Sequence, residues 1–234
     1  MAVIYQEKSG LFTLQTKTTT YQMKVDKYGV LLHTYYGPKT DASDYSYLIM
    51  PADRGYSGQP GDVQDERTYS LDFYPREYPV YGNGDYRIVG MKANLKGQVP
   101  ALDLRYHSSR VMKGKYRLEG LPSMFAEEGE DGVDTLEVVL KDRYEDLYVH
   151  LLYGVYEEDD VITRAVRVEN CTGQAVELKR VMSMSVDFTE RGFELVHFYG
   201  KHAMERQMER QALPHGITEI SSRRGNSSHH PQAA

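Results

Sequence analysis

The sequence predicts an all-β fold, a large antiparallel sandwich with little helix. Apolar and polar residues alternate with a period of two through many segments, as in strands that bury one face. These segments are short and closely spaced, and turns rich in glycine, aspartate and asparagine separate them. No long segment between them has the apolar spacing of an amphipathic helix. The chain also contains 20 tyrosines, a residue that favours half-buried sheet positions.

The N-terminal part of the chain predicts two hairpins, residues 2–6 with 11–16 and residues 20–25 with 30–36. The second pair is the clearer one, because residues 20–25 alternate without a break. The turn that joins its strands ends in Gly29, and glycine suits the backbone conformations of tight turns. These four segments therefore predict two separate pairs of antiparallel strands.

The alternation disappears over residues 51–65, where Gly55, Gly58, Pro60 and Gly61 predict a long loop. A strand is expected again over residues 68–73. The stretch after it is irregular and contains Pro75, Pro79, Gly82 and Gly84. Gly82-x-Gly84 is not a phosphate-binding loop, because a third glycine and a following helix are both lacking.

Six further strands are expected over residues 101–107, 135–140, 147–156, 161–169, 176–188 and 193–199. In the longest, Met182 and Met184 fall on one face and Ser183 on the other. Residues 203–213 differ from these segments. They are rich in strong helix formers, and Met204 and Met208 are four residues apart, so intrinsic propensity alone predicts a helix there.

Composition excludes several classes of function. The net charge of −6 argues against nucleic acid or anionic membranes as partners, since phosphate contact requires clustered lysine and arginine. The single cysteine, Cys171, leaves no intrachain disulfide. Residues 1–10 lack the apolar run of a signal peptide, and no later segment has transmembrane length. We therefore expect a cytoplasmic protein.

No residue pattern predicts catalysis, a metal site or a cofactor. The spacing of a calcium loop is absent from the acidic cluster of Glu127, Glu128, Glu130 and Asp131, which a solvated loop explains. His229-His230 has no second cluster at ligand spacing. We therefore assign no catalytic residue, no metal ligand and no cofactor from residue types and spacing.

Asp53 and Arg67 flank the aperiodic, glycine-rich segment of residues 51–65. Loops of this length in compact domains often carry function, because they can present polar groups to a ligand. Surface charge is the simpler explanation of the same two residues. The residues alone favour that interpretation and leave a ligand site as the alternative.

A series of short motifs runs in order along most of the chain. It begins with Thr68-Tyr69-Ser70-Leu71-Asp72, Arg76-Glu77-Tyr78-Pro79 and Gly82-Asn83-Gly84-Asp85-Tyr86-Arg87. It continues with Gly114-Lys115, Leu121-Pro122, Thr135-Leu136, Leu140-x-Asp142, Ile162-Thr163-Arg164 and Asn170, and ends with Glu205-Arg206 and Ser222-Arg223-Arg224-Gly225-Asn226-Ser227-Ser228-His229. No single motif is specific, but their joint order is. The series resembles the N-terminal domain of bacterial family 36 glycoside hydrolases, which are chiefly α-galactosidases.

The resemblance implies a β-supersandwich similar to the large sandwiches of mutarotase-like proteins. It also implies that residues 203–213 are extended, against their helical propensity. Residues 1–220 would form the N-terminal β-supersandwich domain, and residues 221–234 a linker toward a missing (β/α)8 catalytic barrel. The family's usual Asn-Pro-Phe after the last motif is replaced here by Pro231-Gln232-Ala233-Ala234, preceded by His230.

The resemblance further implies that the parent protein hydrolyses terminal α-linked galactose from melibiose- and raffinose-type oligosaccharides, with retention of configuration. Retention requires two carboxyl groups, and in this family both are aspartates of the barrel. This chain is therefore expected to be inactive alone. Its expected partners are galactose-containing oligosaccharides, its own C-terminal barrel and further copies of itself, in a homo-oligomer of the tetrameric kind.

In tetrameric family members, an aspartate in the loop before the Thr-x-Ser-Leu-Asp motif and an arginine immediately ahead of that motif help to close a neighbour's sugar pocket. The matching positions are Asp53 and Arg67. The resemblance thus assigns both to substrate binding. The length of the intervening loop makes Asp53 the less direct match.

Two alternatives remain open. The chain could be a stand-alone carbohydrate-binding module, although it has no tryptophan, a favoured stacking platform for sugars. The parent could instead be a same-family α-N-acetylgalactosaminidase or galactosyl transferase, which residues of the barrel would decide. A sandwich without its barrel would also expose apolar surface, so we expect self-association.

Overall fold

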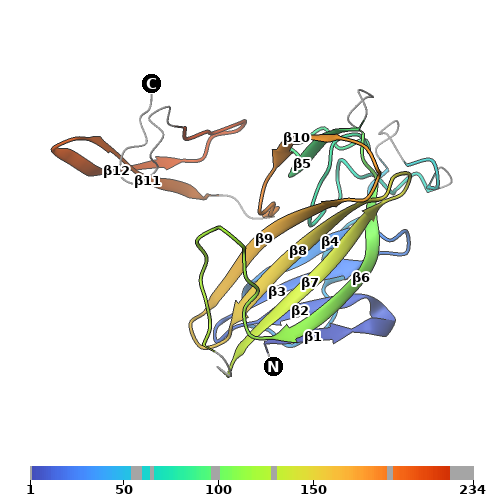
Figure 1. Cartoon of the computed structure of the whole chain (residues 1–234), viewed down its shortest axis with the longest axis horizontal. Coiled ribbons are helices and arrows are strands. Elements are labelled where there is room, and N and C mark those ends of the chain that lie inside the picture. The colour runs from blue at the N-terminus through green and yellow to red at the C-terminus, as the bar shows by residue number, and fades with distance from the viewer. Residues whose placement is uncertain are drawn as a thin grey trace. The chain divides into compact units, whose positions relative to one another are not determined.

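The computed structural model describes residues 2–53, 60–63, 66–95, 101–127, 131–188 and 192–221. The chain forms two compact units, Met1–Asp187 and Phe188–Ala234. Within the described residues, regular structure consists of β-strands and two short 3-10 turns, η1 (Glu7–Ser9) and η2 (Ser46–Leu48) (Figure 1). The predicted all-β fold is confirmed. No helix in this part of the chain is long and apolar enough to cross a membrane.

The first sheet of the larger unit is an antiparallel meander of β1 (Val3–Gln6), β2 (Leu11–Gln15), β3 (Thr19–Val25) and β4 (Leu31–Pro38). Both predicted hairpins are therefore confirmed. The turn between β3 and β4 closes at Gly29, whose φ of 79° lies in the left-handed region that favours glycine. Local sequence signals specify this sheet because each strand pairs with its neighbour along the chain.

The second sheet is also an antiparallel meander, formed by β6 (Leu104–Lys113), β7 (Val133–Asp142), β8 (Leu147–Tyr156) and β9 (Val161–Asn170). The bounds of β8 are those predicted, and β9 is one residue longer. β6 begins and ends later than predicted, and β7 is longer at both ends. The loop from 114 to 127 lies between β6 and β7.

The two sheets pack face to face, as Figure 1 shows for β1–β4 and β6–β9. One buried cluster contains side chains from both sheets, among them Phe12, Leu14 and Met23 from the first and Leu136, Val138, Leu140, Val149, Leu151 and Val155 from the second. Period-two alternation produces this core, because every second residue of β7 from Leu136 to Leu140 belongs to it. The supersandwich prediction is confirmed.

A polar cluster centred on Glu77 lies inside this apolar core. The Glu77 side chain is fully buried and accepts hydrogen bonds from the hydroxyls of Tyr21 on β3 and Tyr153 on β8, both at 2.8 Å to Oε1. The Nη2 atom of Arg164 on β9 lies 2.6 Å from the same oxygen. Burial alone would raise the pKa of the Glu77 carboxyl, but Arg164 and His33 hold it below its ordinary value. One ionised carboxylate thus links the two sheets.

Two strand predictions are wrong. Residues 68–73 form turns, because Tyr69 and Leu71 bury their side chains against Leu32 instead of joining a ladder. The segment predicted as a strand over residues 176–188 is a strand only at β10 (Val176–Val181). Its partner β5 (Met91–Leu95), which sequence patterns did not predict, is only five residues long. Val181 pairs with Met91, the first residue of β5, so no ladder continues along residues 182–188 in the described chain.

The smaller unit contains one hairpin, β11 (Glu194–Lys201) with β12 (Met204–Ala212). β12 covers the segment whose composition favours a helix, so the extended conformation implied by the family resemblance is confirmed. Pairing with β11 supplies the backbone hydrogen bonds that override intrinsic propensity. The single domain over residues 1–220 stays a prediction. Residues 222–234, with the last motif and most of the predicted linker, lie outside the described residues.

Candidate functional site

The structure brings the two predicted site residues together. The Nη2 atom of Arg67 lies 3.2 Å from Oδ2 and 3.4 Å from Oδ1 of Asp53. The side chains remain 72% and 49% exposed, so both charged groups are accessible from solvent. An exposed ion pair contributes little to stability. The pair therefore places one acceptor and one donor group side by side at the surface, as a polyhydroxylated ligand requires. Gly55 and Gly58 of the intervening loop lie outside the described residues.

Arg67 follows directly on a residue that is anchored to the β3–β4 turn. The carboxylate of Glu66 lies 2.5 Å from Lys27 Nζ and accepts a hydrogen bond of 2.7 Å from the Tyr28 hydroxyl. Hydrogen bonds from Lys27 and then from Tyr28 lower the pKa of the Glu66 carboxyl. Behind Arg67, the backbone N–H of Tyr69 donates to the Glu66 carbonyl at 3.0 Å, which closes a turn around the arginine.

A second anchor joins the same two segments through Asp26 and Tyr69. The Tyr69 hydroxyl donates to Oδ2 of Asp26 at 2.5 Å, while Oδ1 of Asp26 accepts the backbone N–H groups of Tyr28 and Val30, both at 2.8 Å. Burial raises the pKa of Asp26, and the hydrogen bond from Tyr69 opposes that rise. Burial and the neighbouring Asp26 raise the pKa of the Tyr69 hydroxyl. The hydroxyl therefore remains a proton donor to Asp26.

A small apolar core lies beneath the turn that carries Arg67. Its buried members are Val30, Leu32, Val63, Tyr69, Leu71 and Tyr74, and Tyr28 and Ile49 pack against it. The Tyr69 ring meets those of Tyr28 and Tyr74 edge-on, with centroids 4.7 Å and 4.9 Å away. This core fixes a segment that has no strand ladder of its own.

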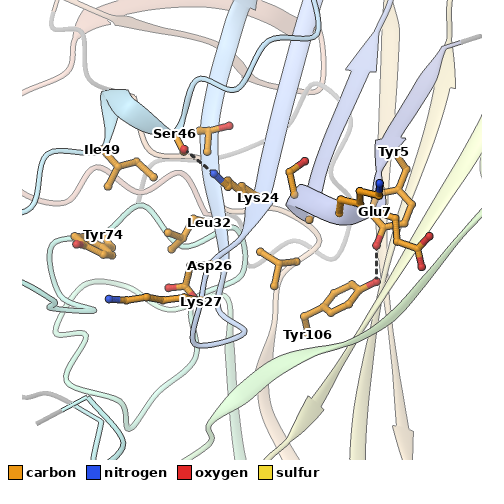
Figure 2. Close-up of a pocket in the computed structure, with 15 residues that line it drawn as sticks. Tyr5, Glu7, Lys24, Asp26, Lys27, Leu32, Ser46, Ile49, Tyr74 and Tyr106 are labelled. Carbon is orange, nitrogen blue, oxygen red and sulfur yellow. Dashed lines mark hydrogen bonds between the residues drawn. The ribbon is translucent and has the colours of Figure 1, made fainter. Parts of the chain in front are cut away.

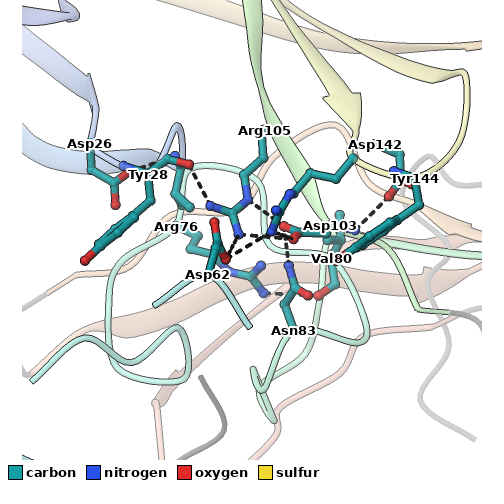
Figure 3. A network of polar contacts seen from close by, with 12 residues as sticks. Asp26, Tyr28, Asp62, Arg76, Val80, Asn83, Asp103, Arg105, Asp142 and Tyr144 are labelled. Carbon is teal, nitrogen blue, oxygen red and sulfur yellow. Dashed lines mark hydrogen bonds and ion pairs between the residues drawn. The ribbon is translucent and has the colours of Figure 1, made fainter. Parts of the chain in front are cut away.

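Figure 3 shows a polar network that ties the start of this segment to the second sheet. An oxygen of Asp62 lies 3.4 Å from Arg105 Nη2 and 3.0 Å from Arg143 Nη1. Both arginines also pair with Asp103, at 2.6 Å and 3.2 Å. Burial alone would raise the pKa of Asp103, but Arg105 and its other donors hold it below its ordinary value. Arg105 Nη1 further donates to the Tyr28 carbonyl at 2.6 Å, so the network reaches the β3–β4 turn.

The motif residues that carry the family resemblance have structural partners of their own. Arg76 Nη2 and Arg87 Nη2 both lie 2.9 Å from Oδ2 of Asp85, whose side chain is fully buried. Arg87 also pairs with Asp187 at 2.7 Å, which fastens the segment after β10 to the loop of residues 74–90. The motifs therefore specify how this loop is held together.

A separate groove of about 640 Å³ lies between η1, the β3–β4 turn and the segment around Ser46 (Figure 2). Neither Asp53 nor Arg67 lines it. Its main polar groups are already paired within the protein: Lys24 contacts Asp44 at 2.5 Å and Ser46 at 2.9 Å, and the hydroxyls of Tyr5 and Tyr106 are 3.3 Å apart. A groove with satisfied polar groups offers a ligand few new hydrogen bonds, so we do not assign it as the binding site.

No cluster of three or more His, Cys, Asp or Glu side chains in the described residues could hold a metal ion. Glu128, Glu130, His229 and His230 lie outside those residues. Asp53 and Arg67 were proposed from the sequence, whereas the contacts of Asp26, Tyr69 and Asp62 that hold their loop were not predicted. Only Asp26 carried a local signal, because aspartate at the start of a turn commonly accepts the N–H groups that follow it.

Comparison with known proteins decides the family. The model of the glycosyl hydrolase family 36 N-terminal domain matches residues 29–233. The chain belongs to this family. The resemblance drawn from the ordered motifs is thereby confirmed, and so is the fold it implied.

Two curated relatives of this family 36 domain are α-galactosidases. The bifunctional α-galactosidase/sucrose kinase AgaSK of Mediterraneibacter gnavus is 48% identical over 98% of this chain and 24% of its own length. The α-galactosidase AgaA of Geobacillus stearothermophilus is 39% identical over 98% of this chain and 31% of its own length. The chain thus spans about a quarter to a third of the length of these relatives.

Solved structures agree with this assignment. The galactosidase domain of AgaSK matches with a TM-score of 0.92 and 47% identity, over 98% of this chain and 31% of that one. Variants of the Geobacillus stearothermophilus α-galactosidase AgaA, solved with raffinose and with stachyose, match with a TM-score of 0.87 and 39% identity. These matches cover 94% of this chain and 30% of each variant.

Proposed function

We propose that this domain belongs to an α-galactosidase that removes terminal α-linked galactose from melibiose- and raffinose-type oligosaccharides with retention of configuration. The observation that carries the proposal is the match to α-galactosidases along nearly the whole chain, at up to 48% identity. The complexes of a relative with raffinose and stachyose indicate the substrate class. Hydrolysis of raffinose by the full-length protein, with release of galactose in the α-configuration, tests it.

The domain itself is non-catalytic in this proposal. A retaining enzyme needs a nucleophile and an acid/base, two carboxyl groups about 5 Å apart across the scissile bond. The exposed acidic residue of the candidate site, Asp53, is paired with the guanidinium of Arg67. The bond-breaking residues are then supplied by a barrel outside these residues. Galactoside cleavage by the purified 234-residue chain, at a rate above that of a mock preparation, would overturn the proposal that the domain is non-catalytic.

The contribution of the domain is to shape the outer part of the substrate pocket through Asp53 and Arg67. A carboxylate accepts hydrogen bonds from sugar hydroxyls, and a guanidinium offers a planar set of donors. Both groups are exposed and adjacent, which supports the proposal. Because they would touch sugar units beyond the terminal galactose, they affect long substrates more than short ones.

Kinetics of full-length Asp53→Ala and Arg67→Ala variants test this role. We expect the KM for raffinose to rise about tenfold, the effect of losing about 1.4 kcal/mol of binding energy. The kcat/KM for a small aryl α-galactoside, which lacks the outer sugar units, stays within about twofold of wild type. Unchanged kcat/KM on both substrates would remove the two residues from the binding site.

The domain also contributes surface for docking on the barrel and on further copies of the protein. In the larger unit, the exposed apolar residues include Tyr86, Ile88, Met182 and Met184. They belong to two segments joined by the hydrogen bond from Met182 N to the Gly90 carbonyl at 2.8 Å. Exposed apolar patches of this kind mark interaction surfaces. Light scattering tests this: we expect the isolated chain to self-associate and the full-length protein to form a defined oligomer. A clean monomer at high concentration in both cases would contradict it.

A further inference from the structure

We propose that Asp26 and Tyr69 are positioning residues for Arg67, so that the β3–β4 turn sets how far the guanidinium reaches toward the outer sugar units of the substrate. The inference rests on the proposed role of Arg67 and extends it to residues that do not touch the ligand. The inference depends on three features of the site. These are the exposure of the Arg67 side chain, the contacts that hold its turn to the β3–β4 turn, and the fixed position of the Asp26 carboxylate.

The guanidinium depends on its turn for its position. The Arg67 side chain is 72% exposed and forms a surface ion pair with Asp53. A long exposed side chain that makes one ion pair retains much of its rotational freedom. The backbone of residues 66–69 therefore determines the position of the Arg67 Cα. It thereby also determines the volume within which the guanidinium can move.

That backbone has no strand ladder to hold it. Residues 66–69 form a turn that the backbone hydrogen bond from Tyr69 N to the Glu66 carbonyl closes, at 3.0 Å, and Glu66 N donates to the Val63 carbonyl at 3.1 Å. Side-chain contacts fasten the turn to the sandwich: Tyr69 donates to Asp26, and Glu66 contacts Lys27 and Tyr28. These contacts end on residues 26–28, so one element holds both sides of Arg67.

Asp26 is suited to this task because its carboxylate is itself fixed. Oδ1 accepts two backbone N–H groups of its own turn at 2.8 Å, which leaves Oδ2 aimed at the Tyr69 hydroxyl 2.5 Å away. The Asp26 carboxylate is thus fixed relative to β3 and β4. Its hydrogen bond in turn fixes Tyr69, which lies two residues after Arg67. The Tyr69 ring fills the small apolar core whether or not it has a hydroxyl, so the hydroxyl is the part that aligns the turn.

The test uses two variants of the full-length enzyme that keep the shape of the side chain. Tyr69→Phe removes the hydroxyl that donates to Asp26. Glu66→Gln removes the negative charge paired with Lys27 but keeps an oxygen that can accept from the Tyr28 hydroxyl. We expect the KM for raffinose to rise about three- to tenfold, because a displaced contact loses most of its binding energy. We expect kcat for raffinose and kcat/KM for a small aryl α-galactoside to stay near wild type. A merely destabilising change would lower activity toward both substrates together.

A double-mutant cycle separates positioning from other effects. Once Arg67→Ala has removed the guanidinium, adding Tyr69→Phe should change the raffinose KM no further. Tyr35→Phe is the matched control, since it also removes one tyrosine hydroxyl that donates a hydrogen bond, in this case to the Pro38 carbonyl at 3.0 Å. This control should leave both substrates unaffected.

The outcomes are distinguishable. If Arg67→Ala raises the raffinose KM but Tyr69→Phe and Glu66→Gln do not, the positioning inference is overturned and the proposed function stands. If the effects of Tyr69→Phe and Arg67→Ala simply add, Tyr69 acts by another route and the inference is likewise overturned. If Arg67→Ala changes nothing, the proposed site fails and takes the inference with it.

Discussion

Thr16 and Asp160 are 144 residues apart in the sequence, yet the Thr16 hydroxyl donates to Oδ1 of Asp160 at 2.5 Å. Thr18 also donates to Asp160 through its hydroxyl and, at 3.0 Å, through its backbone N–H. Asp160 lies in the β8–β9 turn with a φ of 60°. Through these hydrogen bonds, Asp160 joins the β8–β9 turn of one sheet to the β2–β3 turn of the other.

The hydrogen bonds to Asp160 predict that the free energy of unfolding depends on pH. Hydrogen bonds from Thr16 and then from Thr18 lower the pKa of Asp160 to about 2. A carboxyl whose pKa is depressed in the folded state stabilises the protein above its unfolded pKa of about 3.9, and this contribution is lost as the pH falls toward 2. We expect Asp160→Asn to flatten the fall in stability between about pH 4 and pH 2, because asparagine cannot titrate. Asparagine also tolerates the positive φ.

Thermal unfolding of the 234-residue chain at a series of pH values measures this effect. Asp159→Asn, at the neighbouring position of the same turn, is the control and should keep the wild-type slope. The idea fails if Asp160→Asn follows the wild-type pH profile throughout this window.

The buried carboxylate of Glu77 predicts a large loss of stability. In Glu77→Gln the side chain keeps its shape, but Arg164, which is 7% exposed, loses its counter-charge. Removing one partner of a buried ion pair costs about 3–5 kcal/mol, because the remaining charge stays desolvated. Urea unfolding of the chain measures the change. Glu177→Gln is the control: this glutamate pairs with Lys179 at the surface, so its loss should cost less than about 1 kcal/mol.

Gly82 predicts a steric effect at one of the family motifs. Its φ is 119°, and an added Cβ would lie 2.5 Å from the backbone Cα of Ala101. Gly82→Ala therefore combines a strained backbone with a clash that no side-chain rotation relieves, and we expect a loss of about 1–3 kcal/mol in urea unfolding. Gly61→Ala meets open space and should change stability by less than about 0.5 kcal/mol. Equal effects of the two substitutions would contradict this account.

Local patterns predicted the existence of the strands in the two meanders, because each strand pairs with the next along the chain and alternation marks its buried face. Residues 147–156 illustrate this, since predicted and observed bounds of β8 coincide. The predictions failed where burial replaces pairing. Residues 68–73 have strand-like composition, but Tyr69 and Leu71 fill a small core under a turn. The helix formers of residues 203–213 were assigned correctly only through the family resemblance, since the partner strand β11 is what overrides their propensity.

The candidate site was predictable in part for a similar reason. Asp53 and Arg67 flank one loop, so their proximity is a local consequence of the chain returning on itself. The supports of that loop join segments that are distant in sequence: Tyr69 meets Asp26 across 43 residues, and Arg105 meets Asp62 across the same interval. No spacing rule reveals such pairs from a single sequence. The same holds for Glu77 and Arg164, which only the packing of the two sheets brings together.

For the Asp53–Arg67 pair, we expect substitutions to weaken substrate binding while they leave the stability of the fold nearly unchanged. Both side chains are about half exposed or more, and exposed ion pairs are worth about 0–1 kcal/mol. In urea unfolding of the chain, we expect Asp53→Ala and Arg67→Ala each to lower the free energy of unfolding by less than about 1 kcal/mol. The coupling energy between the two substitutions, measured with the double mutant, should also be less than about 1 kcal/mol. Variants this stable remain folded at assay temperature, so a raised raffinose KM can be assigned to lost sugar contacts. A loss above about 2 kcal/mol for either variant would show instead that the pair holds the loop in place, and the kinetic effects would then reflect the fold.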